Sequence, residues 1–162
     1  SDVDGVWTDG GVYYSDQGEL LKKFNFRDGG GIVFSKLANI PVLILSGENS
    51  NSVSKRFEKL GVNNLHLGIR NKYEYLLSYC ANNKINISSV AFIGDDINDL
   101  RLVESCGFTA CPSDASIFIK KVCKNILKSK GGEGAFREFV ELLLDRQGIL
   151  KDTLDKYYQT LT

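Results

Sequence analysis

The sequence lacks the features that mark membrane-bound, exported and nucleic-acid-binding proteins. It contains no apolar run near the roughly 20 residues that a bilayer-spanning helix needs, and no secretory leader is recognisable. Lys+Arg and Asp+Glu both number 20, so no excess of positive charge is available to attract nucleic acid or an anionic membrane. We therefore expect a cytoplasmic protein whose partners are neither nucleic acids nor membranes.

Methionine is absent and cysteine is scarce. The four cysteines, at positions 80, 106, 111 and 123, show no Cys-x-x-Cys spacing, which argues against a zinc site and favours reduced, mostly buried thiols. The lack of any methionine and the start at Ser1 leave no apolar strand ahead of the acidic residues that open the chain. We interpret this pattern as an N-terminal strand missing from the sequence.

What the chain does contain is typical of one globular domain spanning 1–162. Hydrophobic residues make up 43% and charged residues 25% of its 162 positions, which suffices for a core of ordinary size. Two β-rich runs flank a turn-like stretch and predict a projecting hairpin over about 7–26. A continuous apolar run at 41–45 predicts a strand that is buried on both faces.

Strand-like and helix-like segments alternate over the rest of the chain. Further strands are expected at 65–67, 90–93, 108–110 and 125–127. Helices are expected at 32–38, 51–60, 71–82, 97–105, 116–122, 136–144 and 150–161. Repeated strand–helix units indicate an α/β fold, with a parallel sheet that helices cover on both faces.

Acidic and hydroxyl side chains stand where these strands end. Asp2 and Asp4 lie in the opening run SDVDG, and Ser46 directly follows the apolar run. Asp95 follows the strand expected at 90–93. Parallel sheets of this kind bind ligands at the carboxyl ends of their strands. Residues that are far apart in the sequence can therefore converge on one site.

Paired carboxylates beside a second acidic cluster favour a divalent cation and phosphoryl transfer. Asp2 is the candidate nucleophile, because a carboxylate can attack phosphorus and form an aspartyl-phosphate. Asp4 is the candidate acid and base, which protonates the leaving alkoxide and then activates water. The candidate Mg²⁺ ligands are Asp2, Asp4 and Asp95, and Asp99 would orient them.

Two further positions offer groups that suit a phosphate. Ser46, beside Gly47, supplies a hydroxyl and nearby main-chain N–H groups, and Lys72 supplies a cation for the developing charge. Taken singly, these residues also fit a surface Asp-x-Asp, a helix N-terminus, a loop serine or a solvated lysine. Their order along the chain, with three positions at strand ends, favours catalysis. The single histidine, His66, is interpreted as structural.

The same residues resemble the four motifs of the haloacid dehalogenase superfamily of phosphatases, found here as DVDG at 2–5, LSG at 45–47, Lys72 and GDDIND at 94–99. Runs at 4–10, 24–29 and 131–139 resemble its small capless branch more closely. That branch includes 3-deoxy-D-manno-octulosonate 8-phosphate phosphatase, the 9-phosphate phosphatase of the nonulosonate KDN, and a domain fused to some CMP-sialic acid synthetases.

The resemblance implies a Rossmann-like core without a cap domain, Mg²⁺ as cofactor, and a homotetramer. In that family the hairpin packs between subunits, and a neighbour's C-terminal tail, about 131–162 here, helps to close the active site. We accordingly expect truncation after Ser129 to lower catalytic efficiency far more than stability.

The resemblance also bears on the substrate, a small sugar acid phosphate. Glu48, Arg56 and Lys59 resemble the set of the nine-carbon enzyme: Glu48 would bind sugar hydroxyls, and the two cations, one turn apart on a helix, would bind the sugar carboxylate. A solvated charged face is the alternative. Gly47 and Glu133 complete the expected substrate contacts. The nine-carbon substrate is therefore favoured over the eight-carbon one.

The first functional hypothesis is a Mg²⁺-dependent phosphatase of a 2-keto-3-deoxy sugar acid phosphate. The alternative is a non-catalytic oligomerisation domain of a CMP-sialic acid synthetase, which the missing N-terminal strand keeps open. A phosphoacceptor signalling domain also uses Asp, Lys and Ser/Thr. Its acidic pair comes early and its lysine last, which is not the order found here.

Overall fold

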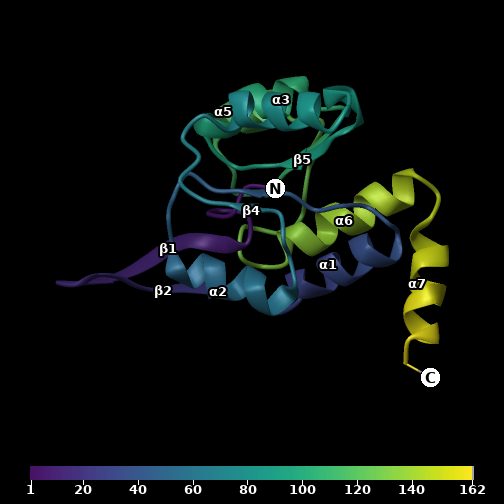
Figure 1. Ribbon diagram of the computed structural model, residues 1–162, viewed down its shortest axis with the longest axis horizontal. Coiled ribbons are helices and arrows are strands. Elements are labelled where there is room, and N and C mark those ends of the chain that lie inside the picture. The colour runs from purple at the N-terminus through teal and green to yellow at the C-terminus, as the bar shows by residue number, and fades with distance from the viewer. Residues whose placement is uncertain (162) are drawn as a thin grey trace.

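The computed structural model of this protein describes residues 1–161. An antiparallel hairpin of β1 (Thr8–Ser15) and β2 (Gly18–Phe24) projects from the body of the molecule (Figure 1). Its position matches the predicted hairpin. The turn between the strands uses Gly18 at a φ of 110°, a conformation that glycine adopts without steric cost.

Short parallel strands form the centre of the fold. β3 (Ile44–Leu45) pairs with β4 (Leu65–His66). β6 (Phe108–Cys111) lies between β5 (Ala91–Ile93) and β7 (Asn125–Ile126). Of the strand predicted at 41–45, only the last two residues pair with β4.

Residues 1–2 join these two groups of strands. The Leu45 N–H donates to the Ser1 carbonyl at 2.9 Å, and the Asp2 N–H donates to the Ile93 carbonyl at 3.0 Å. The Ser1 nitrogen donates to the Leu43 carbonyl at 2.8 Å. The opening segment therefore lies between β3 and β5, in register with both, and brings the strands into one continuous parallel arrangement.

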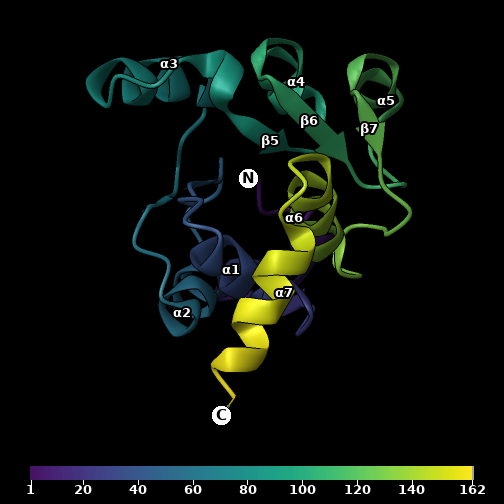
Figure 2. The same cartoon turned by 90° about the vertical axis from the view of Figure 1, so that its right-hand side faces the viewer.

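Helices cover both faces of this arrangement, as predicted for an α/β fold. Figure 2 shows one layer of helices above the strands, formed by α3 (Lys72–Asn82), α4 (Leu100–Ser105) and α5 (Ile117–Val122). The opposite layer contains α1 (Asp28–Leu37), α2 (Asn51–Leu60) and α6 (Ala135–Arg146), and α7 (Leu150–Gln159) packs on α1 and α6. Two short 3-10 helices, η1 (Ile87–Ser89) and η2 (Ile97–Asp99), complete the elements. Among residues 1–161, no helix combines the length and the apolar content that crossing a membrane requires.

Local signals in the sequence explain the bounds of α2 and α3. The Ser50 side chain caps α2 by accepting the Val53 N–H, and Gly61 ends the helix at a φ of 62°. Asn71 caps α3 in the same way by accepting the Glu74 N–H. These caps place Lys72 on the first turn of α3, directly after the loop that faces the strand ends.

The start of α1 differs from the prediction. The helix begins at Asp28 and includes the three glycines that the sequence analysis left outside it. The reason is the close approach of α6: a Cβ on Gly31 would lie 2.8 Å from Cδ1 of the buried Phe136 ring and 3.4 Å from the Arg137 Cα, so a side chain there would force the two helices apart. Asp28 also accepts the Arg137 N–H at 2.9 Å, which fixes the start of α6 against the start of α1.

Helix α6 is part of the core. Trp7 is fully buried and lies between Phe57 and Phe136, with ring centroids 4.8 and 4.2 Å away. Phe139 and Leu144 of α6 belong to the same cluster. Deleting one buried phenylalanine side chain costs roughly 3–5 kcal/mol. The expectation that truncation after Ser129 lowers catalytic efficiency far more than stability is therefore wrong, because truncation would remove this face of the core.

Candidate active site

The carboxyl ends of the strands bring the predicted residues together. Asp2 is held beside β5 by its main-chain hydrogen bond to Ile93, and Asp95 comes just after that strand. Ser46 comes just after β3, one residue beyond Leu45, which bonds to Ser1. Three separate parts of the chain thus meet at one edge because neighbouring parallel strands end there.

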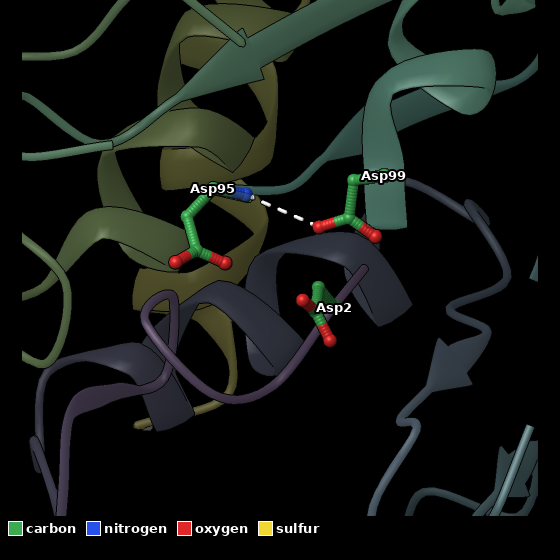
Figure 3. A group of neighbouring side chains, drawn as sticks. All are labelled: Asp2, Asp95 and Asp99. Atoms are coloured by element: carbon green, nitrogen blue, oxygen red, sulfur yellow. Dashed lines mark hydrogen bonds between the residues drawn. The ribbon is translucent and has the colours of Figure 1, made fainter. Parts of the chain in front are cut away.

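Three carboxylates form the centre of the site. Asp2, Asp95 and Asp99 each place an oxygen within 4.8 Å of the others. Figure 3 shows Asp2 from the opening segment, Asp95 after β5 and Asp99 in η2 with their side chains turned toward one another. Asp99 is fully buried and Asp2 nearly so. Such a group repels itself unless a cation or protons neutralise it.

Lys72 supplies one of the neutralising charges. Its Nζ lies 2.6 Å from Oδ1 of Asp2 and 2.8 Å from Oδ1 of Asp99. Its side chain is 1% exposed. Burial by itself lowers the pKa of the lysine, but the carboxylates of Asp2 and Asp99 outweigh burial and raise its pKa above the ordinary value. Lys72 is therefore charged in the metal-free protein and bridges two of the three carboxylates.

One lysine does not neutralise three carboxylates. Burial, followed by repulsion from Asp2, raises the pKa of Asp95 to about 8 and that of Asp99 to about 7. Among the described residues, Oδ1 of Asp95 is buried without a hydrogen-bond partner. A buried carboxylate oxygen without a donor is the kind of atom that a hard cation binds. The site therefore fits Mg²⁺.

Hydrogen bonds distinguish the roles of the three carboxylates. Both oxygens of Asp99 already accept, Oδ1 from Lys72 and Oδ2 from the Asp95 N–H at 3.2 Å. Oδ1 of Asp2 accepts the Val3 N–H at 2.6 Å as well as Lys72. The other oxygen of Asp2 and the carboxylate of Asp95 are thus the groups left for a metal or a phosphate, and Asp99 orients its neighbours.

Asp4 lies outside the group of three. The chain turns after it at Gly5, whose φ is 79°. A Cβ on Gly5 would lie 2.0 Å from Oδ2 of Asp95, so this turn requires glycine. The Asp4 carboxylate instead accepts from Nζ of Lys22 at 2.7 Å and from Oγ1 of Thr8 at 3.4 Å. Both donors contact Oδ1, and the role of Asp4 as a metal ligand stays a prediction.

Lys22 is the residue that the sequence analysis missed. It stands on β2, and its side chain is 1% exposed. The one signal in the sequence is a pair of adjacent lysines in the hairpin, one of which must face the body of the protein because strand side chains alternate.

Ser46 and Gly47 stand where a phosphate would meet main-chain N–H groups. Ser46 is 1% exposed, and its Oγ accepts the Glu48 N–H at 3.2 Å. Gly47 is exposed. The hydroxyl therefore already stabilises the loop and keeps its own proton for another acceptor.

The four predicted sugar-binding side chains differ in their surroundings. Glu48, Lys59 and Glu133 are exposed. Arg56 turns toward the base of the hairpin, where its Nη2 donates to the Asn25 carbonyl at 3.1 Å. The expectation that Arg56 and Lys59 act as a pair is not reflected in their surroundings here, because the arginine side chain packs against the hairpin and the lysine faces solvent.

Comparison with known proteins gives this geometry a family. A family model described as haloacid dehalogenase-like hydrolase matches residues 65–139. The chain is 37% identical over 148 residues to 3-deoxy-D-manno-octulosonate 8-phosphate phosphatase of Haemophilus influenzae, covering 91% of this chain and 82% of that protein.

Solved structures agree. A cobalt-bound phosphatase of that name from Haemophilus influenzae superposes with a TM-score of 0.86 at 37% identity, covering 92% of this chain and 87% of that one. The Moraxella catarrhalis enzyme, solved with magnesium, phosphate and a KDO molecule, gives a TM-score of 0.90 at 31% identity and covers 96% and 90%. The chain therefore belongs to the haloacid dehalogenase superfamily, in the branch of the 3-deoxy-D-manno-octulosonate 8-phosphate phosphatases, and is a phosphoric monoester hydrolase.

Proposed function

We propose that this phosphatase uses Mg²⁺ to hydrolyse the phosphate monoester of a 2-keto-3-deoxy sugar acid through an aspartyl-phosphate on Asp2. The observation that carries the proposal is the buried group of Asp2, Asp95 and Asp99, which Lys72 neutralises only in part. The structures of two relatives with magnesium or cobalt support the choice of a divalent cation.

The chemistry follows from which atoms are free. The oxygen of Asp2 that does not face Lys72 attacks phosphorus, and the bond from phosphorus to the sugar oxygen breaks. Asp4 gives its proton to that oxygen, then takes a proton from the water that cleaves the aspartyl-phosphate. Lys72 and Ser46 stabilise the charge on the phosphoryl oxygens. Asp2 and Asp95 would hold Mg²⁺, which would supply further positive charge to the phosphate.

We propose 3-deoxy-D-manno-octulosonate 8-phosphate, the eight-carbon sugar acid, as the substrate. The support is the match to relatives of that name over most of the chain. The sequence-based preference for the nine-carbon sugar rested on Glu48 together with Arg56 and Lys59. Arg56 contacts the hairpin instead, so that preference loses part of its support.

The nine-carbon phosphate remains the second candidate because of Glu48. This exposed carboxylate stands two residues after Ser46, where it can meet sugar hydroxyls beyond the phosphate. On this assignment we expect Glu48→Gln to lower catalytic efficiency on the nine-carbon substrate more than on the eight-carbon one.

Phosphate release from the two sugar acid phosphates, measured side by side, tests the proposal. We expect turnover with Mg²⁺, none with chelator, and a higher kcat/KM on the eight-carbon substrate. A preference for the nine-carbon substrate would overturn the substrate assignment but keep the phosphatase. If neither phosphate is hydrolysed in the presence of Mg²⁺, the result would favour the alternative, a non-catalytic oligomerisation domain. The intact Asp2, Lys72 and Asp95 argue against that alternative.

Magnesium should stabilise the protein more as the pH rises. The folded-state pKa values of Asp95 and Asp99, about 8 and about 7, lie above the ordinary value of 3.8. The metal-free folded state therefore holds protons that the unfolded chain releases, so its free energy of unfolding falls as the pH rises from about 4 to about 8. A bound cation replaces those protons and removes the loss.

The measurement is the melting temperature with Mg²⁺ and with chelator at about pH 6 and about pH 8. We expect the Mg²⁺-dependent increase to be larger at the higher pH and to shrink in Asp95→Asn. Asp28, whose pKa burial raises to about 6, provides an internal comparison, since its effect on stability is independent of the metal. An equal Mg²⁺ effect at both pH values would contradict the assignment of these carboxylates to the cation.

We also propose the homotetramer that the family resemblance implies. Tyr13, Tyr14 and Leu21 of the hairpin are each more than half exposed, at 66%, 70% and 63%. Apolar side chains grouped on a projecting hairpin favour contact with another subunit. Light scattering at several protein concentrations, with Tyr13→Ser/Leu21→Ser as the comparison variant, tests this assembly.

A further inference from the structure

Lys22 is a buried cation that the proposed chemistry has not used. Its Nζ lies 2.7 Å from Oδ1 of Asp4 and 3.6 Å from Oε2 of Glu19, and the side chain is 1% exposed. Its neighbour Lys23 is 63% exposed and pairs with Asp9 at 3.0 Å. Taking an ammonium group out of water is costly. The position of Lys22 is thus set by the two carboxylates that it contacts.

A continuous set of contacts ties Lys22 to the rest of the site. Glu19, on the same strand, contacts Lys22 through Oε2 and accepts a hydrogen bond from the Ser50 hydroxyl through Oε1. Ser50 is the cap residue of α2. The hairpin is therefore fastened to the start of α2 on one side and to Asp4 on the other, and Lys22 joins the two.

These contacts occupy one oxygen of Asp4 and leave the other available. Lys22 and Thr8 both donate to Oδ1. A carboxyl group that transfers a proton needs one oxygen directed at the reacting atom and the rest of the group held still. The side chain of Asp4 is 29% exposed, so its free oxygen can reach a substrate.

We propose that Lys22 is a positioning residue for Asp4, holding Oδ1 so that Oδ2 delivers the proton to the leaving sugar oxygen. The inference rests on the proposed function, and it goes further by assigning the hairpin a role in proton transfer. A sugar alkoxide is a poor leaving group, so its departure depends on protonation, which contributes about 10²–10⁴-fold. p-Nitrophenolate leaves without a proton, so its phosphate ester does not need Asp4 as an acid.

The experiment compares two substrates with leaving groups of different basicity. Lys22→Met keeps the length and apolar stem of the side chain and removes its charge, and Lys23→Met is the matched control on the same strand. The measured quantity is kcat/KM for 3-deoxy-D-manno-octulosonate 8-phosphate and for p-nitrophenyl phosphate, because kcat/KM reports on the first phosphoryl transfer. Melting temperatures of all variants accompany the kinetics.

We expect Lys22→Met to lower kcat/KM at least tenfold more for the sugar phosphate than for p-nitrophenyl phosphate. Asp4→Asn should show the same selectivity, Lys22→Arg should recover part of the loss, and Lys23→Met should resemble the wild type. Equal losses on both substrates would overturn the inference, as would a change confined to KM for the sugar phosphate. Wild-type protein inactive on both substrates would instead contradict the proposed function.

Discussion

Replacing Asp2 with asparagine should lower turnover by on the order of 10⁴-fold or more, which is the scale of losing a catalytic nucleophile. The amide has nearly the shape of the carboxylate, but its nitrogen carries protons and its oxygen is a poor nucleophile. Its oxygen can still accept from Lys72 and from the Val3 N–H, which now hold Oδ1 of Asp2. The fold should therefore survive the substitution.

The measurement is kcat/KM on the sugar acid phosphate together with the melting temperature. Asp16→Asn, in the exposed turn of the hairpin, is the matched control for the chemical change and should leave both quantities unaltered. Substantial activity in Asp2→Asn would show that phosphorus is attacked by another group, such as water, and would remove the aspartyl-phosphate from the mechanism.

The aspartyl-phosphate on Asp2 should also be detectable directly. Asp4→Asn removes the base that activates water, so p-nitrophenyl phosphate should leave this variant carrying one phosphoryl group, visible by mass spectrometry of the intact protein. The double variant Asp2→Asn/Asp4→Asn should carry none. Phosphorylation of the double variant would place the modified residue elsewhere.

The placement of the central residues was predictable because their distances follow from topology. Ser46 and Asp95 come just after strands that pair in parallel with a neighbour, and Asp2 lies in the opening segment that bonds to β3 and β5. In a parallel sheet, the residues that directly follow neighbouring strands lie at the same edge, even when they are far apart along the chain. The caps of α2 and α3 were predictable because they are local: the cap side chain accepts from the N–H three positions further along the chain.

The surroundings of Asp4 could not be predicted in this way. Lys22 and Lys23 are adjacent and chemically identical, but only Lys22 is buried, and the choice depends on the register of β1 against β2. That register contains irregularities between Thr8 and Val12 and between Tyr13 and Tyr14. A one-residue shift would turn Lys23 toward Asp4 instead.

Arg56 shows the same limit on a helix. Its spacing from Lys59 places the two cations on one face of α2, which is what the sequence predicted. A long side chain, however, follows its nearest acceptor, and the Asn25 carbonyl at the base of the hairpin lies within reach. The Arg56 Cζ also lies 5.9 Å from the centre of the Phe24 ring. The place of Arg56 on α2 could thus be predicted from the sequence, but the direction of its side chain depends on contacts with the hairpin, which is distant in sequence.

Replacing Lys72 with methionine should lower both stability and turnover, and Mg²⁺ should restore the first but not the second. Without metal, the variant leaves Asp2 and Asp99 facing each other with no cation between them. Breaking a buried pair in this manner costs roughly 3–5 kcal/mol in the free energy of unfolding. The loss should be larger at about pH 8 than at about pH 6. The pKa of Asp95 is about 8 and that of Asp99 about 7, so at the lower pH both carboxyl groups hold protons that partly replace the charge of the lysine.

Lys55→Met is the matched control for the loss of a lysine. Lys55 is 82% exposed and pairs with Glu58 at 3.2 Å on the surface of α2, an interaction worth about 1 kcal/mol or less. Denaturant unfolding of both variants, with chelator and with Mg²⁺, measures the difference. An equally small effect of both substitutions would contradict the picture of Lys72 as the counter-charge of a buried carboxylate group.

Magnesium should restore much of the stability of Lys72→Met but little of its turnover. Mg²⁺ can neutralise the carboxylates in place of the lysine. In the variant no ammonium group competes with Mg²⁺ for the Asp2 carboxylate, so Mg²⁺ should bind more tightly. It cannot also supply the second positive charge that Lys72 contributes to the phosphoryl oxygens, and losing such a fixed charge costs about 10²–10³-fold in kcat. Full recovery of kcat at saturating Mg²⁺ would mean that Lys72 serves only to neutralise the carboxylates in the folded protein. Recovery of stability without recovery of kcat would show that Lys72 also stabilises charge during phosphoryl transfer.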